Sequence, residues 1–332
     1  MNFLVTGGCG FIGVNLVLTL LSQNHGHRIR VVDNLSVGKK EDLASIGKVT
    51  EIEKEEIGEQ FAHKLELVVG DVRDEDLAKV ACQGGDILVH LAASTGVMPS
   101  IENPMEDCIS NVLGTLNYLE AARLNGARGF VFASSGAPVG EQNPPIHEKM
   151  VPRPISPYGA SKLAGEAYCA AYHGSFGLDT VALRFGNVYG PHSNHKTSVV
   201  AEFIKHILNS EPLPIYGDGN QTRDFIYVDD LIQAISLCLD RPGIGGQIFQ
   251  IATHKEHTVL EVAEELNRLA VKHLGRKSEI SFENERKGEI KRNYSDISKA
   301  RKMLGFELKY DLKEGLEKTF LWFLEDYQQE MK

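Results

Sequence analysis

The chain has 332 residues, 42% of them hydrophobic, which is enough to bury the core of one large domain or two modest ones. Its formal net charge of −10 would repel a phosphate backbone and argues against nucleic acid as a partner. The five cysteines are scattered and lack C-x-x-C spacing, which disfavours disulfides and a zinc site; we expect no metal and a reducing cytoplasm.

The amino-terminal segment has the pattern of a strand, a glycine turn and a helix. A β-prone run at 3–6 precedes GGCGFIG at 7–13, and an apolar helical pattern continues through Leu21. Gly8, Gly10 and Gly13 fit G-x-G-x-x-G, while Gly7 with the last two fits G-x-x-G-x-x-G. Either spacing lets backbone N–H groups at a helix N-terminus approach a pyrophosphate; the alternative is a glycine turn without a ligand. Because the glycines interrupt the apolar run and no basic leader precedes it, we expect neither a signal peptide nor a membrane span.

An acidic residue ends the next predicted strand, Arg28 to Val32. Asp33 lies 20 residues after Gly13. A carboxylate in this position binds both ribose hydroxyls of a dinucleotide and repels a 2′-phosphate. The sequence therefore predicts NAD, not NADP, as the cofactor.

The chain then alternates between predicted strands and helices. Residues 36–64 are charged and irregular, and we interpret them as a solvated excursion from the sheet. Apolar runs at 65–69 and 86–93 are typical of buried parallel strands, and Asp71 and Val72, after the first of them, are predicted to lie near the adenine. A helix at 105–125, a strand at 129–135 and a helix from Pro157 continue the alternation. The fold class is therefore α/β, a doubly wound parallel (Rossmann) sheet with its ligand at the carboxyl ends of the strands.

Candidate catalytic side chains follow two of these elements. Tyr158 and Lys162 lie four residues apart on one helix face, and an ammonium beside a phenol would lower the phenol's pKa towards the working pH. Ser134 and Ser135 end the strand before this helix, where a hydroxyl can bond a substrate hydroxyl while the tyrosine removes its proton. The alternative for the Y-x-x-x-K pattern alone is a chance pair on a surface helix. Asn111 is either a support for this site or a structural amide.

Five motifs resemble the extended short-chain dehydrogenases, in particular nucleotide-sugar epimerases of the UDP-glucose 4-epimerase type. They cover most of the chain in the family's order: TGGCGFIG at 6–13, HLAA at 90–93, SPYGASK at 156–162, LRFGNVYGP at 183–191 and RDFIYVDDL at 223–231. The resemblance implies a catalytic trio of Ser135, Tyr158 and Lys162. It also implies a UDP-sugar substrate, a cytoplasmic location, and a homodimer built on helices near 105–124 and 158–175.

The resemblance further implies two sets of binding residues. The NAD-binding set is Gly7, Gly10, Phe11, Ile12, Gly13, Asp33, Asn34, Asp71, Val72, Leu91, Ala92, Ala93, Tyr158 and Lys162. The substrate-binding set is Thr95, Ser135, Asn187, Arg223, Arg286, Glu289 and Asn293. Within it, Asn187 and Arg223 are expected to help hold the diphosphate, which arginine binds well through paired contacts.

The carboxyl-terminal part reads as a smaller α/β substrate domain. Helices are predicted at 196–209, 259–274 and 312–328, with short strands at 213–217 and 224–228. We therefore divide the chain into an NAD-binding domain at 1–190 and a mainly substrate-binding domain at 191–332, with residues about 224–250 returning to the first. The segment 180–190 is predicted as one strand that feeds directly into the second domain.

Three details bear on specificity. Pro138 alters the loop after Ser135 relative to the family's S-A-x-V-Y-G. The basic side chains at 192–196 are either solvated or meet an acidic group of the substrate. In the register of the family's R-x-G-D…D-x-S-K-A segment, Asn293 replaces the tyrosine of glucose-restricted epimerases and should leave room beside C2 of the sugar; a slip of one residue would place Tyr294 there.

The leading hypothesis is 4-epimerisation of a UDP-hexose, N-acetylhexosamine or uronate. A 4,6-dehydratase or a decarboxylase needs acids where Gly136 and Ala137 stand, and a 4-ketoreductase would normally use the NADPH that Asp33 disfavours. A non-catalytic NAD-binding protein on the same fold is the alternative from another class, and the intact Ser135, Tyr158 and Lys162 argue against it.

Overall fold

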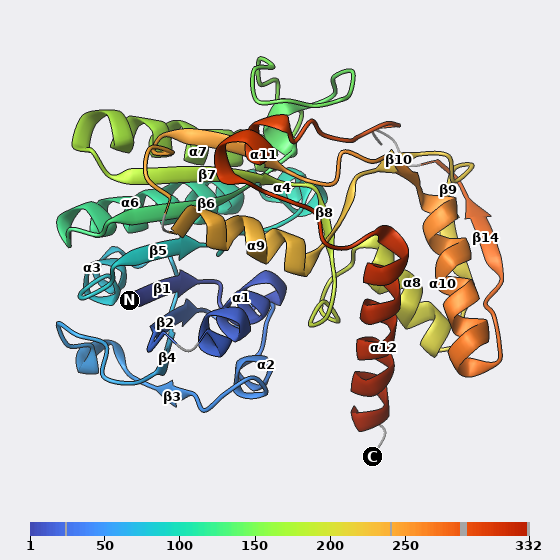
Figure 1. Ribbon diagram of the computed structural model, residues 1–332, viewed down its shortest axis with the longest axis horizontal. Helices are drawn as coiled ribbons and strands as arrows, with labels where there is room; N and C mark the ends of the chain where they lie inside the picture. Colours follow the sequence, from blue (N-terminus) through green and yellow to red (C-terminus); the bar gives the residue numbers. More distant parts are fainter. Residues whose placement is uncertain (24, 240, 286–290, 331–332) are drawn as a thin grey trace.

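The computed structural model describes residues 1–23, 25–239, 241–285 and 291–330 (Figure 1). Across these residues eight strands form one parallel sheet in the order β12-β7-β6-β5-β1-β2-β4-β3, which confirms the predicted doubly wound arrangement. The order reverses at β1, which pairs with β2 on one side and β5 on the other. The strands are β1 (Asn2–Thr6), β2 (Arg28–Asp33), β3 (Thr50–Glu51), β4 (Leu65–Val69), β5 (Ile87–His90), β6 (Gly129–Ser135), β7 (Asp179–Phe185) and β12 (Gln247–Ile251).

Helices cover both faces of this sheet, so alternate strand residues enter two separate hydrophobic cores. On β1, Phe3 and Val5 belong to one core and Leu4 to the other. The first core includes side chains of α1 (Phe11–Ser22) and α9 (Val228–Leu239). The second includes side chains of α3 (Glu75–Ala81), α6 (Gly114–Leu124) and α7 (Pro157–Phe176). Burial on both faces explains why these strands read as continuous apolar runs.

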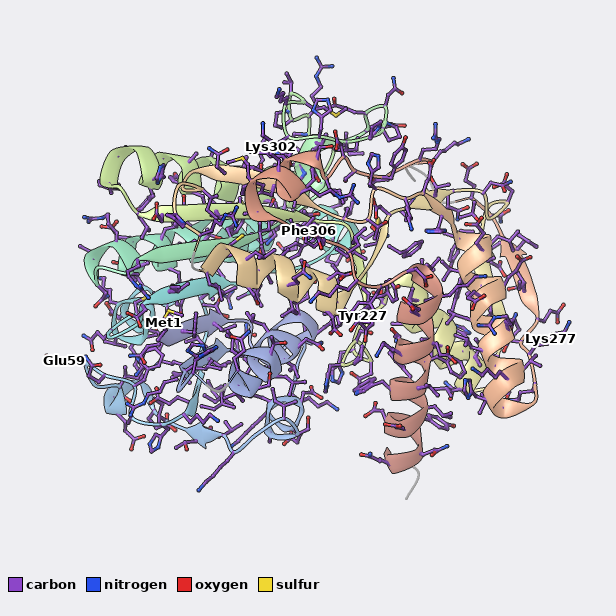
Figure 2. The ribbon with its side chains drawn as sticks, viewed as in Figure 1. Met1, Glu59, Tyr227, Lys277, Lys302 and Phe306 are labelled. Carbon is purple, nitrogen blue, oxygen red and sulfur yellow. The ribbon has the colours of Figure 1, made fainter. Side chains whose placement is uncertain are left out.

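A smaller lobe lies beside the sheet, on the right of Figure 1. Its helices α8 (Val199–Leu208), α10 (Val259–Leu274) and α12 (Leu312–Glu330) pack together next to the paired strands β9 (Leu213–Tyr216) and β14 (Ile280–Glu283). Tyr227, labelled between the lobes in Figure 2, packs on the rings of Tyr189 and Tyr310 at 5.8 and 4.7 Å between centroids. These contacts join the two lobes.

Shorter elements connect the lobes and line the sheet edge. Two pairs of short strands are β8 (Asn187–Tyr189) with β11 (Phe225–Tyr227), and β10 (Thr222–Arg223) with β13 (His257–Thr258). The remaining short helices are α2 (Lys40–Ala44), α4 (Val97–Glu102), α5 (Pro104–Cys108), α11 (Ser298–Leu304), a π turn at Ile109–Leu113 and 3₁₀ turns at Lys54–Glu56 and Ala137–Val139.

Three segments differ from the sequence-based expectation. The predicted strand 180–190 breaks at Gly186, where a Cβ would lie 3.0 Å from the Asp224 carbonyl oxygen, so the chain leaves the large sheet at the close approach of a neighbouring backbone. The predicted excursion at 36–64 contributes β3, which pairs with β4 at the sheet edge. The predicted helix 105–125 contains the π turn between α5 and α6.

The chain returns to the large sheet after β11. α9 packs against α1, and β12 pairs in parallel with β7 at the sheet edge. α9 and β12 therefore lie with the large sheet. The functional division at residue 190 stays a prediction.

Candidate active site

The glycine turn after β1 forms a cradle at the N-terminus of α1. Gly7 has a φ of +71°, and a Cβ there would lie 2.7 Å from the Ala92 amide nitrogen, so the turn packs on the end of β5. A Cβ on Gly13 would lie 2.3 Å from the Gly7 carbonyl oxygen. At Gly10, by contrast, the only described atom near a Cβ would be that same oxygen, at 3.3 Å. Among the described residues no side chain caps α1, so its first N–H groups, including those of Phe11 and Ile12, suit a pyrophosphate.

Asp33 lies beside this cradle at the end of β2. Its buried carboxylate accepts hydrogen bonds from the backbone N–H groups of Cys9 and Leu35, both at 2.9 Å. Burial raises the pKa of Asp33, and the two N–H groups oppose that rise. The carboxylate is therefore fixed next to the glycine turn, where an adenosine ribose would lie in a dinucleotide fold.

Asp71 and Val72, the residues predicted to lie near the adenine, follow the end of the neighbouring strand β4. Asn34 Nδ2 donates to Asp71 Oδ2 at 3.0 Å, and Arg73 donates to both carboxylate oxygens of Asp71 at 2.8 Å. These bonds, led by the Arg73 guanidinium, lower the pKa of Asp71 to about 2. Val72 is buried against Gly114, where a Cβ would lie 2.8 Å from Val72 Cγ2. Contact of Asp71 and Val72 with an adenine stays a prediction.

Only one of the two serines at the end of β6 is directed to the tyrosine. Ser134 Oγ donates to Glu166 Oε1 at 2.5 Å, and Arg184 donates to both oxygens of Glu166 at 2.7 Å. We call Ser134, Glu166 and Arg184 the Glu166 network; all three side chains are buried. Ser135, in contrast, lies close enough to Tyr158 to lower the pKa of its phenol. The structure therefore supports the choice of Ser135 for the catalytic hydroxyl.

The sequence analysis assigned no function to Glu166 and Arg184, although the sequence contained an indication for each. Glu166 lies four residues after Lys162, on the same face of α7, and is buried. Arg184 is a charged residue in the otherwise apolar run of β7. A buried charge needs a partner, so these two residues were candidates for a pair.

α7 brings Tyr158 and Lys162 together as the four-residue spacing predicts. Ser156 caps the helix by accepting the Gly159 N–H at 3.1 Å. Lys162 is only 3% exposed, and its Nζ lies 5.9 Å from the centroid of the Tyr158 ring. That ammonium donates to the Ala133 carbonyl oxygen at 2.9 Å, which ties α7 to β6.

The expectation that Lys162 lowers the pKa of Tyr158 is wrong in this structure. Burial raises the pKa of Tyr158 to about 12, and the neighbouring Ser135 side chain opposes the rise. Burial also lowers the pKa of Lys162 to about 8, against the attraction of Asp107 and Glu166. The desolvation that disfavours the phenolate also disfavours the ammonium, and the ammonium bonds a backbone carbonyl instead of the phenol.

Asn111, buried in the π turn, connects the end of β5 to α7. Its Oδ1 accepts the Ser94 N–H at 2.8 Å, and its Nδ2 donates to the Ser94 carbonyl at 2.9 Å and to Asp107 Oδ1 at 2.8 Å. Nδ2 also lies 3.3 Å from Ser161 Oγ, next to Lys162. Of the two interpretations of Asn111, these contacts favour support of the site. The buried Asp107 was not anticipated from the sequence.

The end of β5 and the loop after β6 complete this side. Leu91, Ala92 and Ala93 are partly buried, and Thr95 is exposed; their ligand contacts stay predictions. The 3₁₀ turn that contains Pro138 packs on α7, because a Cβ at Gly159 would lie 2.7 Å from the Ala137 carbonyl oxygen.

Asn187 and Arg223, the residues predicted to bind the diphosphate, lie on the short strands β8 and β10. β8 pairs with β11 so that Asn187 lies opposite Phe225, two residues after Arg223. Between them, the buried Asp224 accepts hydrogen bonds from Thr253 N and Oγ1 (2.7 and 2.6 Å), His254 N (3.0 Å) and Ser295 N (3.2 Å).

The hydrogen bond from the Ser295 N–H to Asp224 also positions the chain near Asn293, the residue predicted to leave room beside C2 of the sugar. Asn293 is half-buried and lies two residues before Ser295. The other two predicted nucleotide contacts, Arg286 and Glu289, lie outside the described residues.

The basic side chains of the loop at 192–196 are not fully exposed to solvent. His195 Nε2 bonds Asp42 Oδ2 at 3.0 Å, and Lys196 is half-buried. Burial lowers the pKa of Lys196, and the charge of Lys196 in turn lowers the pKa of Lys162. The simpler interpretation of this loop, solvated basic side chains, is therefore wrong.

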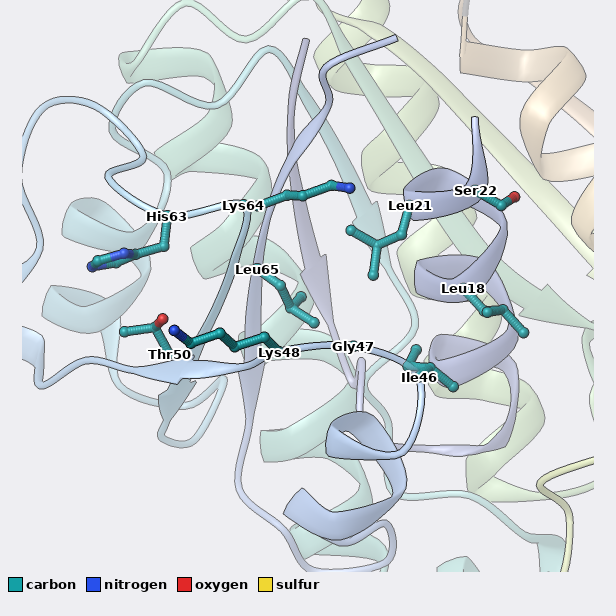
Figure 3. A pocket seen from close by; sticks show the side chains of 10 residues that line it. All are labelled: Leu18, Leu21, Ser22, Ile46, Gly47, Lys48, Thr50, His63, Lys64 and Leu65. Atoms are coloured by element: carbon teal, nitrogen blue, oxygen red, sulfur yellow. The ribbon is translucent and has the colours of Figure 1, made fainter. Parts of the chain in front are cut away.

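A pocket of about 610 Å³ lies elsewhere, between the end of α1 and the start of β4 (Figure 3). It is lined by Leu18, Leu21, Ser22, Ile46, Gly47, Lys48, Thr50, His63, Lys64 and Leu65. Because Leu65 begins β4, this pocket lies at the amino ends of the strands, opposite the side where ligands bind in such sheets. We do not place the active site there.

In the part of the chain that the structure describes, no helix combines the length and the apolar composition that a membrane span needs. No group of three or more His, Cys, Asp or Glu side chains there is arranged to hold a metal ion.

Known proteins match the chain over most of its length. Residues 3–252 match the model of the NAD dependent epimerase/dehydratase family. The chain belongs to this family. A putative UDP-glucose 4-epimerase of Methanocaldococcus jannaschii is 38% identical over 325 residues, covering 96% of this chain and 97% of that protein.

Solved structures of epimerases share the fold. The UDP-glucose 4-epimerase of Thermotoga maritima, crystallised with UDP-glucose, has a TM-score of 0.87 and 32% identity, over 98% of this chain and all of that one. The UDP-glucuronic acid 4-epimerase of Bacillus cereus, in complex with UDP-glucuronic acid and NAD, has a TM-score of 0.84 and 30% identity, with the same coverage. The family is NAD-dependent, and the open space at Gly10, the uncapped α1 and the fixed Asp33 fit that cofactor.

Proposed function

We propose that this protein catalyses the NAD-dependent 4-epimerisation of a UDP-sugar. The observation that carries the proposal is the proximity of Ser135, at the carboxyl end of β6, to Tyr158 and Lys162 at the start of α7, on the side of the sheet where the glycine turn after β1 lies. The similarity to 4-epimerases over nearly the whole chain supports it. Gly136 and Ala137 offer no acid or base for elimination, which disfavours a dehydratase or a decarboxylase.

In this proposal the side chains move one proton in each direction. Bound NAD, held by the glycine cradle and Asp33, would reversibly accept a hydride from C4, and its positive ring would favour the phenolate of Tyr158. Tyr158 takes the C4 hydroxyl proton while Ser135 bonds the same oxygen, which yields a 4-keto sugar. After the sugar turns over, Tyr158 returns the proton as the hydride returns to the other face. Lys162, tied to the Ala133 carbonyl, holds its charge beside the tyrosine.

The test is incubation of the pure protein with a panel of UDP-sugars and chromatographic separation of the C4 epimers. We expect interconversion of at least one pair without added reductant. Absence of turnover with every sugar, while NAD is bound, would favour the non-catalytic alternative.

The protein is expected to retain NAD through purification, because epimerisation regenerates the cofactor in each cycle and gains nothing from its release. The measurement is denaturation of the protein and identification of the nucleotide in the supernatant. Replacement of Asp33 by Ser should weaken NAD binding and relax the discrimination against NADP, since it removes the carboxylate beside the glycine turn. NADP in the supernatant, or tighter binding of NADP by the wild type, would show that Asp33 does not select the cofactor.

Asn293 is predicted to admit an N-acetyl group at C2 of the sugar, so UDP-N-acetylhexosamines should be accepted alongside, or instead of, neutral hexoses. The measurement is kcat/KM for UDP-N-acetylglucosamine and UDP-glucose, in the wild type and in Asn293→Tyr. We expect the tyrosine to reduce the ratio of the two values, because it narrows the space beside C2. An unchanged ratio would show that Asn293 does not determine which substituent at C2 is accepted.

We also propose a cytoplasmic homodimer. Exposed apolar side chains gather on the helices at 105–124 and 158–175 that the resemblance implies for the interface, or next to them. They include Met105, Leu113, Leu124, Tyr168 and Phe176.

A further inference from the structure

Residues 140–153, which we call the bridging loop, lie between the 3₁₀ turn after β6 and the start of α7. The two ends of the loop are bonded to each other. The Arg153 N–H donates to the Val139 carbonyl at 3.2 Å, and Gln142 Nε2 donates to the Val139 and Val151 carbonyls at 2.9 and 2.8 Å. Val139 ends the 3₁₀ turn that packs on α7. The base of the loop is therefore part of the scaffold that holds the catalytic side chains.

The far part of the bridging loop pairs with the segment that precedes α11. The buried Ile146 donates its N–H to the Tyr294 carbonyl and accepts the Asp296 N–H at its own carbonyl, both at 2.8 Å, which forms a parallel β bridge. Glu148 Oε1 accepts the Gln250 N–H at 2.8 Å, so the loop is also bonded to the edge strand β12. A carboxylate that accepts a backbone N–H makes one of the stronger hydrogen bonds in a protein. Glu148 is therefore the anchor that fixes the loop to the sheet.

The bridged segment lies at the edge of the sheet where the active site is placed. Ser135, Phe185 and Ile251 are in register on the adjacent parallel strands β6, β7 and β12. Neighbouring strands are about 4.8 Å apart, so Ile251 lies roughly 10 Å from Ser135. Ser295, in the bridged segment, donates from Oγ to Gln250 Oε1 at 3.3 Å, one residue before Ile251. The bridging loop thus connects the scaffold of the catalytic trio to a second segment that borders the same site.

We infer that Glu148 is a positioning residue: through the bridging loop it holds the segment 293–296 at a fixed distance from Tyr158. The inference rests on the proposed 4-epimerase function and deepens it. The 4-keto sugar has given its hydride to the cofactor and its proton to Tyr158, and it must turn over without leaving. A bordering segment that can move lets the ketone leave before it takes them back. The hydride then stays on the bound cofactor, and that molecule of enzyme is arrested.

The experiment compares the wild type with Glu148→Ala, with the best UDP-sugar of the panel. We expect kcat/KM to fall about 10–100-fold, the range for loss of one hydrogen bond to a charged group. During turnover the variant should accumulate reduced cofactor, detected by its absorbance, and release 4-keto sugar, whereas the wild type should show neither. Glu148→Gln should behave like the wild type, because its amide oxygen can accept the Gln250 N–H. Glu148→Asp, whose side chain is shorter, should show a smaller change of the same kind.

Glu141→Ala is the matched control. Glu141 is an exposed carboxylate of the same loop that bonds no described residue, so its removal should change none of these quantities. Amide hydrogen exchange provides a second readout that needs no turnover. Glu148→Ala should speed the exchange of the Ile146 and Asp296 N–H groups, which form the bridge, and Glu141→Ala should not.

Two results overturn the inference: unchanged exchange at the bridge in Glu148→Ala, or a loss of activity without trapped reduced cofactor, which indicates a merely structural role. The proposed function has a separate outcome. If the wild type turns over no sugar, that function fails, whereas faster exchange in Glu148→Ala still shows that Glu148 holds the bridged segment.

Discussion

Replacement of Tyr158 by Phe is expected to lower turnover by about 10²–10⁴-fold, the usual contribution of general acid–base catalysis. The substitution deletes only the phenolic oxygen, whose pKa the neighbouring Ser135 lowers. The fold and NAD binding should persist, because the helix cap at Ser156 and the bond from Lys162 to the Ala133 carbonyl do not involve that oxygen. The measurement is kcat with the best sugar of the panel, together with the NAD content of the purified variant.

Tyr168→Phe is the matched control for this experiment. Tyr168 lies on the same helix, is 39% exposed and stands ten residues from Tyr158. Its replacement removes one exposed hydroxyl and keeps the aromatic ring that would pack in the proposed dimer, so kcat should stay unchanged within about twofold. Wild-type turnover in Tyr158→Phe would show that another group carries the proton.

Arg184→Met should lower the free energy of unfolding by about 3–5 kcal/mol, because removal of one partner leaves a buried charge uncompensated. Arg184 and Glu166 are both 1% exposed, and after the substitution Ser134 would be the one described residue that still donates to the carboxylate. Turnover should fall as well, since the Glu166 network holds the end of β6, where Ser135 follows Ser134. The measurements are urea denaturation and kcat per folded molecule.

A second buried pair provides the comparison. Arg30 and Glu66 join β2 to β4 at 2.8 Å and are equally buried, but belong to no part of the catalytic trio. Arg30→Met should lose similar stability and retain kcat in the folded fraction. The double variant Glu166→Gln with Arg184→Met should be more stable than Arg184→Met, because it leaves no unpaired charge. If folded Arg184→Met has wild-type kcat, the network stabilises the protein without positioning Ser135.

Much of the fold could be predicted from local patterns in the sequence. The strands β1, β2, β4 and β6 lie where the apolar runs predicted, because a strand with both faces covered by helices must be apolar at every position. Tyr158 and Lys162 share a face of α7 because helical geometry brings residues four apart together whatever surrounds them. The glycines at 7 and 13 could be predicted because close backbone contacts leave no room for a side chain there, whereas Gly10 faces open space where a ligand would lie.

The tertiary structure alone decided the chemistry around these residues. Ser134 turns to Glu166 and Ser135 to Tyr158 because Arg184, from another strand, holds the Glu166 carboxylate. The pKa of Tyr158 rises and does not fall, because burial outweighs the effect of Ser135 and the charge of Asp107 adds to the rise. The segment 190–198 is held by contacts from α1, α2 and α12, which no local pattern in the sequence indicates. Periodicity and spacing act over a few residues and are visible in a sequence, whereas pairing and desolvation depend on distances between segments far apart in the chain.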